Sequence, residues 1–280
     1  MSKELDKQSV DNNKGSALRI LNDFLDDLCD GSNGDLKKAN LISYWIKDYV
    51  SYLKFEDTFD PKRNISYKRG DIVKINFGFN VGSEYGGLHY AVVLDNNNAQ
   101  SSPVVTVIPL TSQKQGKHIH PNDVDLGNEL YISLKAKYDA LSKSLDEKSA
   151  IVSSLMQKAN ILDLESAEAY SRVDFSIHEY DQMISYVEYA EKENSLSAVL
   201  QTLQVERQEI ASQKAILDKI GNEIMRMKGG SVALVNLIDT VSKMKIFDPK
   251  ATGDVLSGIR LSSSNMEKIN NKVKQLYIFS

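Results

Sequence analysis

A long stretch without proline or glycine constrains this chain more than any other feature. All five prolines lie outside residues 122–248, and residues 128–220 contain no glycine either. Since these two residue types most disfavour a helix interior, nothing in this stretch interrupts a helix. Apolar residues recur there in a seven-residue pattern, first from Tyr131 to Leu162 and again from Leu196 to Met227. The pattern predicts two long helices that pair as an antiparallel coiled-coil hairpin.

The apolar seam of the first of these helices contains one charged residue, Lys148. Aligning the two repeats in antiparallel register places Lys148 close to Glu206 and Glu209. We therefore expect an ion pair at this layer, which would fix the register more than it would stabilise the fold. Residues 163–194 are rich in aromatic side chains, and they predict a helical tip with a small core of its own.

The rest of the chain divides around this hairpin. Residues 1–60 show helical periodicity twice and predict an N-terminal helical pair. Residues 61–127 change to β-branched and alternating patterns that predict three strands, and residues 229–280 predict at least one more strand and a closing helix. Because glycines flank residues 128–228, we interpret the hairpin as an insertion into the β portion. The predicted class is α+β: a small β-barrel in two parts, with the inserted hairpin and N-terminal helices.

Two details of the β portion carry further expectations. Pro109 lies near the end of the third predicted strand, and it predicts that this end is an edge or a rim, because proline donates no ladder hydrogen bond. The predicted β segments are basic, whereas the helical segments are acidic. A basic barrel suits a polyanion as partner, although ordinary surface variation would explain the same surplus.

The composition limits the class of protein and the cellular compartment in which we expect it. Apolar residues make up 41% of the 280 residues and charged residues 26%, which excludes disorder for most of the chain. The single cysteine, Cys29, can form no internal disulfide, so a reducing compartment is the default. The beginning of the chain lacks the apolar segment of a secretory signal, and no run is long enough to span a bilayer. We expect a cytoplasmic protein without a membrane partner.

The β portion contains three consecutive motifs: KRGDIVKINF at residues 68–77, NVGSEYGGLHYAVVLDN at residues 80–96 and SPVVTVIPLTS at residues 102–112. Together they resemble the PemK/MazF family of toxin endoribonucleases. The resemblance covers residues 68–113 well and residues 231–280 more loosely. It implies an SH3-like β-barrel that commonly dimerises, cleaves single-stranded RNA without a metal and is neutralised by a separate antitoxin.

The resemblance also implies where the catalytic residues lie. In the family, an arginine on the strand after the Gly-Gly turn and a threonine at the end of the next strand are essential. The threonine falls on Thr111, with Ser112 beside it, but the arginine position holds His89. An imidazole titrates near neutrality, so we hypothesise a nuclease in which His89 is the general acid or base. Losing the permanent charge of arginine could equally leave a binding module that cleaves weakly or not at all.

Five other residues are candidates for RNA contacts. Tyr85 and Tyr90 could stack unpaired bases or be half-buried barrel aromatics. Glu84 is placed by the resemblance in the functional glycine loop, where it could equally cap the turn. Arg69 and Lys74 are cations that could attract the strand.

Two observations weigh on metal and RNA binding. Asp239 puts a negative charge where relatives often carry arginine, which argues against tight RNA binding. His118 and His120 share one face of any extended segment, but no third ligand is evident in the sequence. We therefore predict no metal and no other cofactor.

The sequence analysis ends in two candidate functions. The first is a toxin-type endoribonuclease of a type II toxin–antitoxin system, a homodimer that cleaves single-stranded RNA by metal-independent attack of the 2′-hydroxyl and has a protein antitoxin as partner. The alternative is a catalytically weak or inactive MazF-like interaction protein that binds a partner or nucleic acid through its barrel or hairpin.

Overall fold

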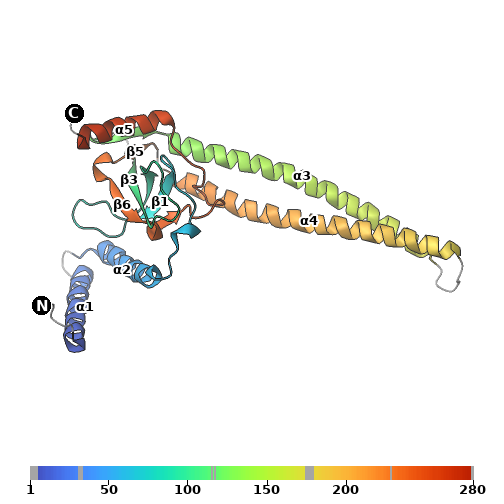
Figure 1. The fold of residues 1–280 in the computed structure, drawn as a ribbon, viewed down its shortest axis with the longest axis horizontal. Helices are drawn as coiled ribbons and strands as arrows, with labels where there is room; N and C mark the ends of the chain where they lie inside the picture. The colour runs from blue at the N-terminus through green and yellow to red at the C-terminus, as the bar shows by residue number, and fades with distance from the viewer. Residues whose placement is uncertain are drawn as a thin grey trace.

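The computed structural model describes residues 6–30, 34–114, 116, 118–173, 180–227 and 229–278, except for the side chains of residues 180–183. These residues form five α-helices and one antiparallel sheet (Figure 1). The helices are α1 (Lys7–Asp30), α2 (Leu36–Glu56), α3 (Glu129–Ser171), α4 (Tyr180–Arg226) and α5 (Ser263–Tyr277). The strands are β1 (Ile72–Asn76), β2 (Leu88–Val93), β3 (Val104–Ser112), β4 (Val124–Gly127), β5 (Ser231–Ala233), β6 (Asp239–Ser242) and β7 (Ile246–Asp248).

The sheet joins strands from both sides of the long helices. Its hydrogen-bonded order is β4-β5-β3-β2-β1-β7, and β6 also pairs with β3. Strands β5, β6 and β7 follow α4 in sequence but pair with strands that precede α3. Among the described residues β4 and β7, at the two ends of this order, do not pair with each other. The sheet is therefore not closed, and the predicted barrel is not confirmed.

The position of Pro109 corrects one expectation from the sequence. Strand β3 lies inside the sheet, where it pairs with β2, β5 and β6, so it is not an edge strand. Along one side of β3 the partner is β6 up to Val107 and β5 from Leu110 onward. Pro109 lies at this change of partner, where a strand can lack one donor without breaking a ladder.

The helices α3 and α4 form a long antiparallel pair that projects from the sheet (Figure 1). The predicted ion pair is confirmed: the Lys148 Nζ lies 3.6 Å from an oxygen of Glu206 and also bonds Glu209. Tyr170 and Tyr189 pack near the far end, with ring centroids 5.3 Å apart. The middle of the predicted aromatic tip, residues 174–179, lies outside the described residues.

The base of the helix pair shares the hydrophobic core of the sheet. Leu130 and Leu134 of α3 and Ile220 of α4 are buried in one cluster with Ile72 of β1 and Ile108 of β3. This packing joins the last turns of α4 firmly to the sheet, because core side chains are close-packed and cannot shift independently.

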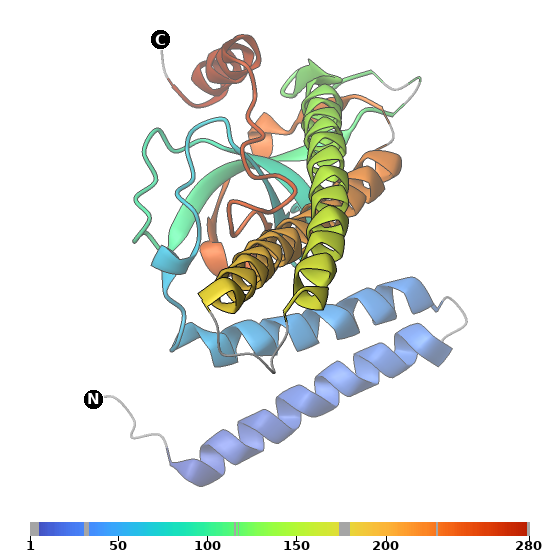
Figure 2. The same cartoon turned by 90° about the vertical axis from the view of Figure 1, so that its right-hand side faces the viewer.

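The N-terminal helices lie on one side of the sheet, opposite α5, and α2 is the nearer of the two (Figure 2). The Trp45 ring of α2 lies directly against Gly78, where an added Cβ would come within 2.6 Å of the ring. Asp48 and Tyr52 hydrogen-bond the side chain of Asn76 at the end of β1. In the part of the chain that the structure describes, no helix is long and apolar enough to cross a membrane.

Candidate active site

A pocket opens where β2 and β3 separate. Their hydrogen-bonded register ends at Ala91 opposite Pro109, and two residues further it would place His89 opposite Thr111. The pocket has a volume of about 200 Å³ and lies between these two strand ends, β5 and the last turn of α4. Five of the candidate residues line it: Lys74, His89, Tyr90, Thr111 and Ser112. The fold therefore brings all three predicted catalytic residues to one place.

His89 is half-buried at the wall of this pocket. Its ring packs against that of Tyr85, with centroids 4.6 Å apart, and its Nε2 faces Gly87. Burial lowers the pKa of His89, which the backbone of Gly86 opposes only in part. The imidazole is therefore mainly neutral near pH 7 in the free protein. His89 also lines a second hollow of about 870 Å³ between the sheet and α2, so it lies between two concave surfaces.

Tyr85 and Glu84 have structural roles in the loop before β2. The Tyr85 hydroxyl donates a hydrogen bond to the carbonyl of Leu110 at 2.9 Å, and its ring packs edge-on against Phe77. The Glu84 carboxylate is exposed and accepts from the backbone N–H of Val81. Of the alternatives that the sequence left open, these contacts favour a half-buried aromatic for Tyr85 and a turn cap for Glu84.

Lys74 and Tyr90 both bind a residue of α4 that the sequence analysis did not single out. The Lys74 Nζ lies 2.5 Å from Oε1 of Glu223, and the Tyr90 hydroxyl donates to the same oxygen. The side chains of Lys74 and Glu223 are only 16% and 14% exposed. Burial alone would raise the pKa of Glu223, but the bonds from Lys74 and Tyr90 outweigh burial and lower it. For Tyr90, burial and the Glu223 carboxylate both raise the pKa of the phenol.

Arg69 is not brought to the pocket. Its guanidinium donates to the carbonyl of Leu94 and to the side chain of Asn270 in α5. These bonds join α5 to the sheet, so the structure gives Arg69 a structural role and does not favour the predicted RNA contact.

The last turn of α4 adds a second residue that sequence reasoning missed, Arg226. It lines the pocket together with Glu223, and its side chain is exposed. Both charges lie just before Gly229, where the chain returns to the sheet. Charged residues at the end of the apolar repeat, next to this re-entry point, were the signal available in the sequence.

The two histidines considered as metal ligands, His118 and His120, do not form part of a metal-binding cluster among the described residues. His118 and His120 are exposed, and the Nδ1 of His120 accepts from the backbone of Asn122. Within the described ranges, no group of three or more His, Cys, Asp or Glu side chains could hold a metal ion. Asp239 is exposed at the start of β6 and does not line the pocket that holds His89 and Thr111.

Comparison with known families agrees with the motifs in the strands. Residues 68–155 match the family model described as the PemK-like, MazF-like toxin of type II toxin-antitoxin systems. The chain carries a PemK/MazF-like toxin domain. The matched segment of this toxin domain spans β1 to β4 and the first part of α3, and it includes His89 and Thr111. Glu223 and Arg226 lie outside it. No curated protein matches the chain significantly.

Proposed function

We propose that this protein is the toxin of a type II toxin–antitoxin system and that it acts as a metal-independent endoribonuclease on single-stranded RNA. Toxins of the PemK family are generally endoribonucleases, and the family match covers four strands that form the pocket or support it. The observation that carries the proposal is the pocket itself. It holds His89, Thr111 and Ser112 together at the point where β2 and β3 separate.

The chemistry of RNA cleavage without a metal gives these residues roles. A base removes the proton of the ribose 2′-hydroxyl, the resulting oxygen attacks the adjacent phosphorus, and an acid protonates the leaving 5′-oxygen. The products are a 2′,3′-cyclic phosphate and a free 5′-hydroxyl. His89 is the general base or the general acid, because it is the imidazole at the pocket wall. The hydroxyls of Thr111 and Ser112 orient the phosphate and donate hydrogen bonds to its oxygens.

The partners follow from the same proposal. The substrate is a single-stranded RNA whose backbone enters the pocket, and a protein antitoxin neutralises the toxin. Assembly into a homodimer, which the family resemblance implies, and residence in the cytoplasm, which the composition predicts, both remain predictions.

Cleavage of a short unstructured RNA in the presence of EDTA tests the proposal. We expect the wild-type protein to cleave and His89→Ala to lose about 10²- to 10⁴-fold in rate, the usual contribution of a general acid or base. His120→Ala is the matched control, because His120 is exposed and lies outside the pocket. Both variants should keep the wild-type circular dichroism spectrum.

Two outcomes would contradict the proposal. Wild-type protein that leaves the RNA intact would favour the non-catalytic interaction protein. Cleavage that continues unchanged in His89→Ala would show that the activity does not use this pocket.

A further inference from the structure

Of the two described cations that line the pocket, Lys74 forms an ion pair and Arg226 does not. Lys74 is neutralised by Glu223, with which it forms a nearly buried ion pair. Arg226 is exposed, and it forms no ion pair with any carboxylate of the described residues. Arg226 is near enough to Glu223 to help lower the pKa of that carboxyl, but it lies beyond ion-pair distance and is open to solvent. Among the described residues that line the pocket, it is therefore the cation best placed to bind an anion.

The backbone that carries Arg226 is held in place at the base of the helix pair. Ile220 is completely buried in the core of the sheet, and Ile224 and Met227 pack against the same core on either side of Arg226. On the neighbouring helix, the Lys137 Nζ donates to three backbone carbonyls, of Asp254, Val255 and Ser257. The last turn of α4 is thus fixed relative to the pocket, while the Arg226 side chain reaches solvent.

Arginine suits a phosphate in this position. Its planar guanidinium is always charged and can donate two parallel hydrogen bonds to phosphate oxygens. Strand position 89, which the family resemblance assigns to an arginine, holds a histidine here. A site that handles a phosphodiester through this histidine still lacks a permanent positive charge on the phosphate.

We propose that Arg226 binds a phosphate of the nucleic-acid strand in the pocket and so supplies, from the inserted helix pair, the guanidinium that is missing at position 89. This inference rests on the proposed function, and it says where a phosphate of the RNA substrate binds. The phosphate lies between Arg226 on α4 and the hydroxyls of Thr111 and Ser112 on β3. Arg226 lies outside the segment that matches the toxin family, so α4 completes the site.

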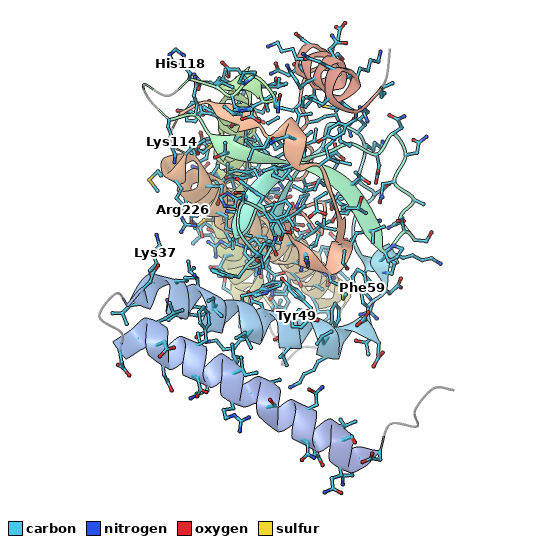
Figure 3. All side chains as sticks on the ribbon, turned by 90° about the vertical axis from the view of Figure 1, so that its left-hand side faces the viewer. Lys37, Tyr49, Phe59, Lys114, His118 and Arg226 are labelled. Carbon is cyan, nitrogen blue, oxygen red and sulfur yellow. The ribbon has the colours of Figure 1, made fainter. Side chains whose placement is uncertain are left out.

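The surroundings of Arg226 suit a strand that continues beyond the pocket. In Figure 3, Arg226 lies on the same side of the molecule as Lys114 and His118, and Lys37 of α2 projects along the same edge. Lys114 and Lys37 are exposed. Neighbouring phosphates of a bound strand would meet these cations, while the phosphate at the reacting position meets Arg226.

Binding of an uncleavable strand tests this contact separately from catalysis. The probe is a short single-stranded 2′-O-methyl oligoribonucleotide, which lacks the attacking hydroxyl, and its affinity is measured by fluorescence anisotropy at several salt concentrations. We expect Arg226→Gln to bind more weakly and to make the salt slope, d log K/d log[salt], less negative by about 0.7, the value of one phosphate contact on a single strand. Arg226→Lys keeps the charge and should retain most of the slope.

The matched control is Arg207→Gln. Arg207 is an exposed arginine of the same helix, and its guanidinium contacts Met156 on α3, away from the base of the α3–α4 pair. It should bind like wild type. In a cleavage assay with unmodified RNA, Arg226→Gln should lose about 10²-fold in kcat, because a donor to the developing charge is removed.

The outcomes separate this inference from the proposed function. If Arg226→Gln matches Arg207→Gln in salt slope and affinity, or binds more tightly, the phosphate contact is refuted, whether or not the wild type cleaves RNA. Wild-type protein that does not bind the oligonucleotide at all refutes it as well. If binding depends on Arg226 but unmodified RNA stays intact, the contact stands and the endoribonuclease proposal fails.

Discussion

Glu223→Ala should destabilise the protein by about 3 kcal/mol, because it leaves Lys74 nearly buried without its partner. Removing one member of a fully buried ion pair costs roughly 3–5 kcal/mol. Here the two side chains are 16% and 14% exposed, so water reaches them slightly and the lower end applies. Glu223→Gln should cost less, about 1–2 kcal/mol, since the amide oxygen can still accept from Lys74 and Tyr90.

A double-mutant cycle isolates the interaction between the two residues. Replacing both members of a buried pair by apolar residues of similar size is often nearly neutral. We therefore expect the double variant Lys74→Met/Glu223→Met to unfold close to wild type, and each single variant to lose more. The measurement is the free energy of unfolding from urea titrations at pH 7, with the m-values compared to confirm that the transition is unchanged. Single losses that simply add in the double variant, within about 0.5 kcal/mol, would refute the reasoning.

The same pair predicts a pH dependence. The folded protein holds the pKa of Glu223 below its ordinary value of 4.5. A lowered pKa means that the carboxylate stabilises the fold above pH 4.5, and that this stabilisation is lost as the pH falls toward and through the folded value. The difference in unfolding free energy between wild type and Glu223→Gln should be constant above about pH 6 and shrink below pH 4.5. A difference that stays constant down to pH 3 would contradict the assignment.

Two further predictions concern the attached helices. Gly78→Ala should loosen α2 and shift the emission of Trp45, the only tryptophan, to longer wavelength, because a Cβ at Gly78 would meet the ring at 2.6 Å; Gly82→Ala, which has a positive φ but open space around it, is the control, and equal shifts in both variants would argue against the clash. Lys148→Met should leave the urea midpoint and the m-value close to those of wild type, because its ion pairs are partly exposed and such pairs add little net stability. A clear fall in the midpoint would show that the pair stabilises the fold and does more than set the register.

The sequence predicted the parts of the fold that repeat over many residues. The seven-residue pattern runs through residues 131–162 and 196–227, so α3 and α4 were evident, and the register that placed Lys148 beside Glu206 followed from the same repeat. The alternation around Val73 and the β-branched run after Pro103 likewise predicted β1 and β3. Each of these signals is local, and each reports which face of an element is buried.

The remaining features depend on contacts between distant residues. Strands β4 and β7 have only four and three residues, too few for an alternating pattern to stand out. Pro109 was misjudged because its missing donor is harmless only where β3 changes partner. Arg226 and Glu223 reach the pocket because α4 returns to the sheet beside β2 and β3. No local sequence pattern predicts this long-range arrangement. His89 and Thr111 were identified because they lie in the sequence motifs that resemble the family.

The hydrophobic core that the α3–α4 pair shares with the sheet has a consequence for synthesis of the protein. Ile220, Arg226 and β5 are made more than a hundred residues after the strands that carry His89 and Thr111. At ordinary translation rates of about 5–20 residues per second, many seconds separate these parts of the pocket. Under the proposed function, a growing chain on the ribosome could not cleave the messenger that encodes it until almost the whole polypeptide has emerged.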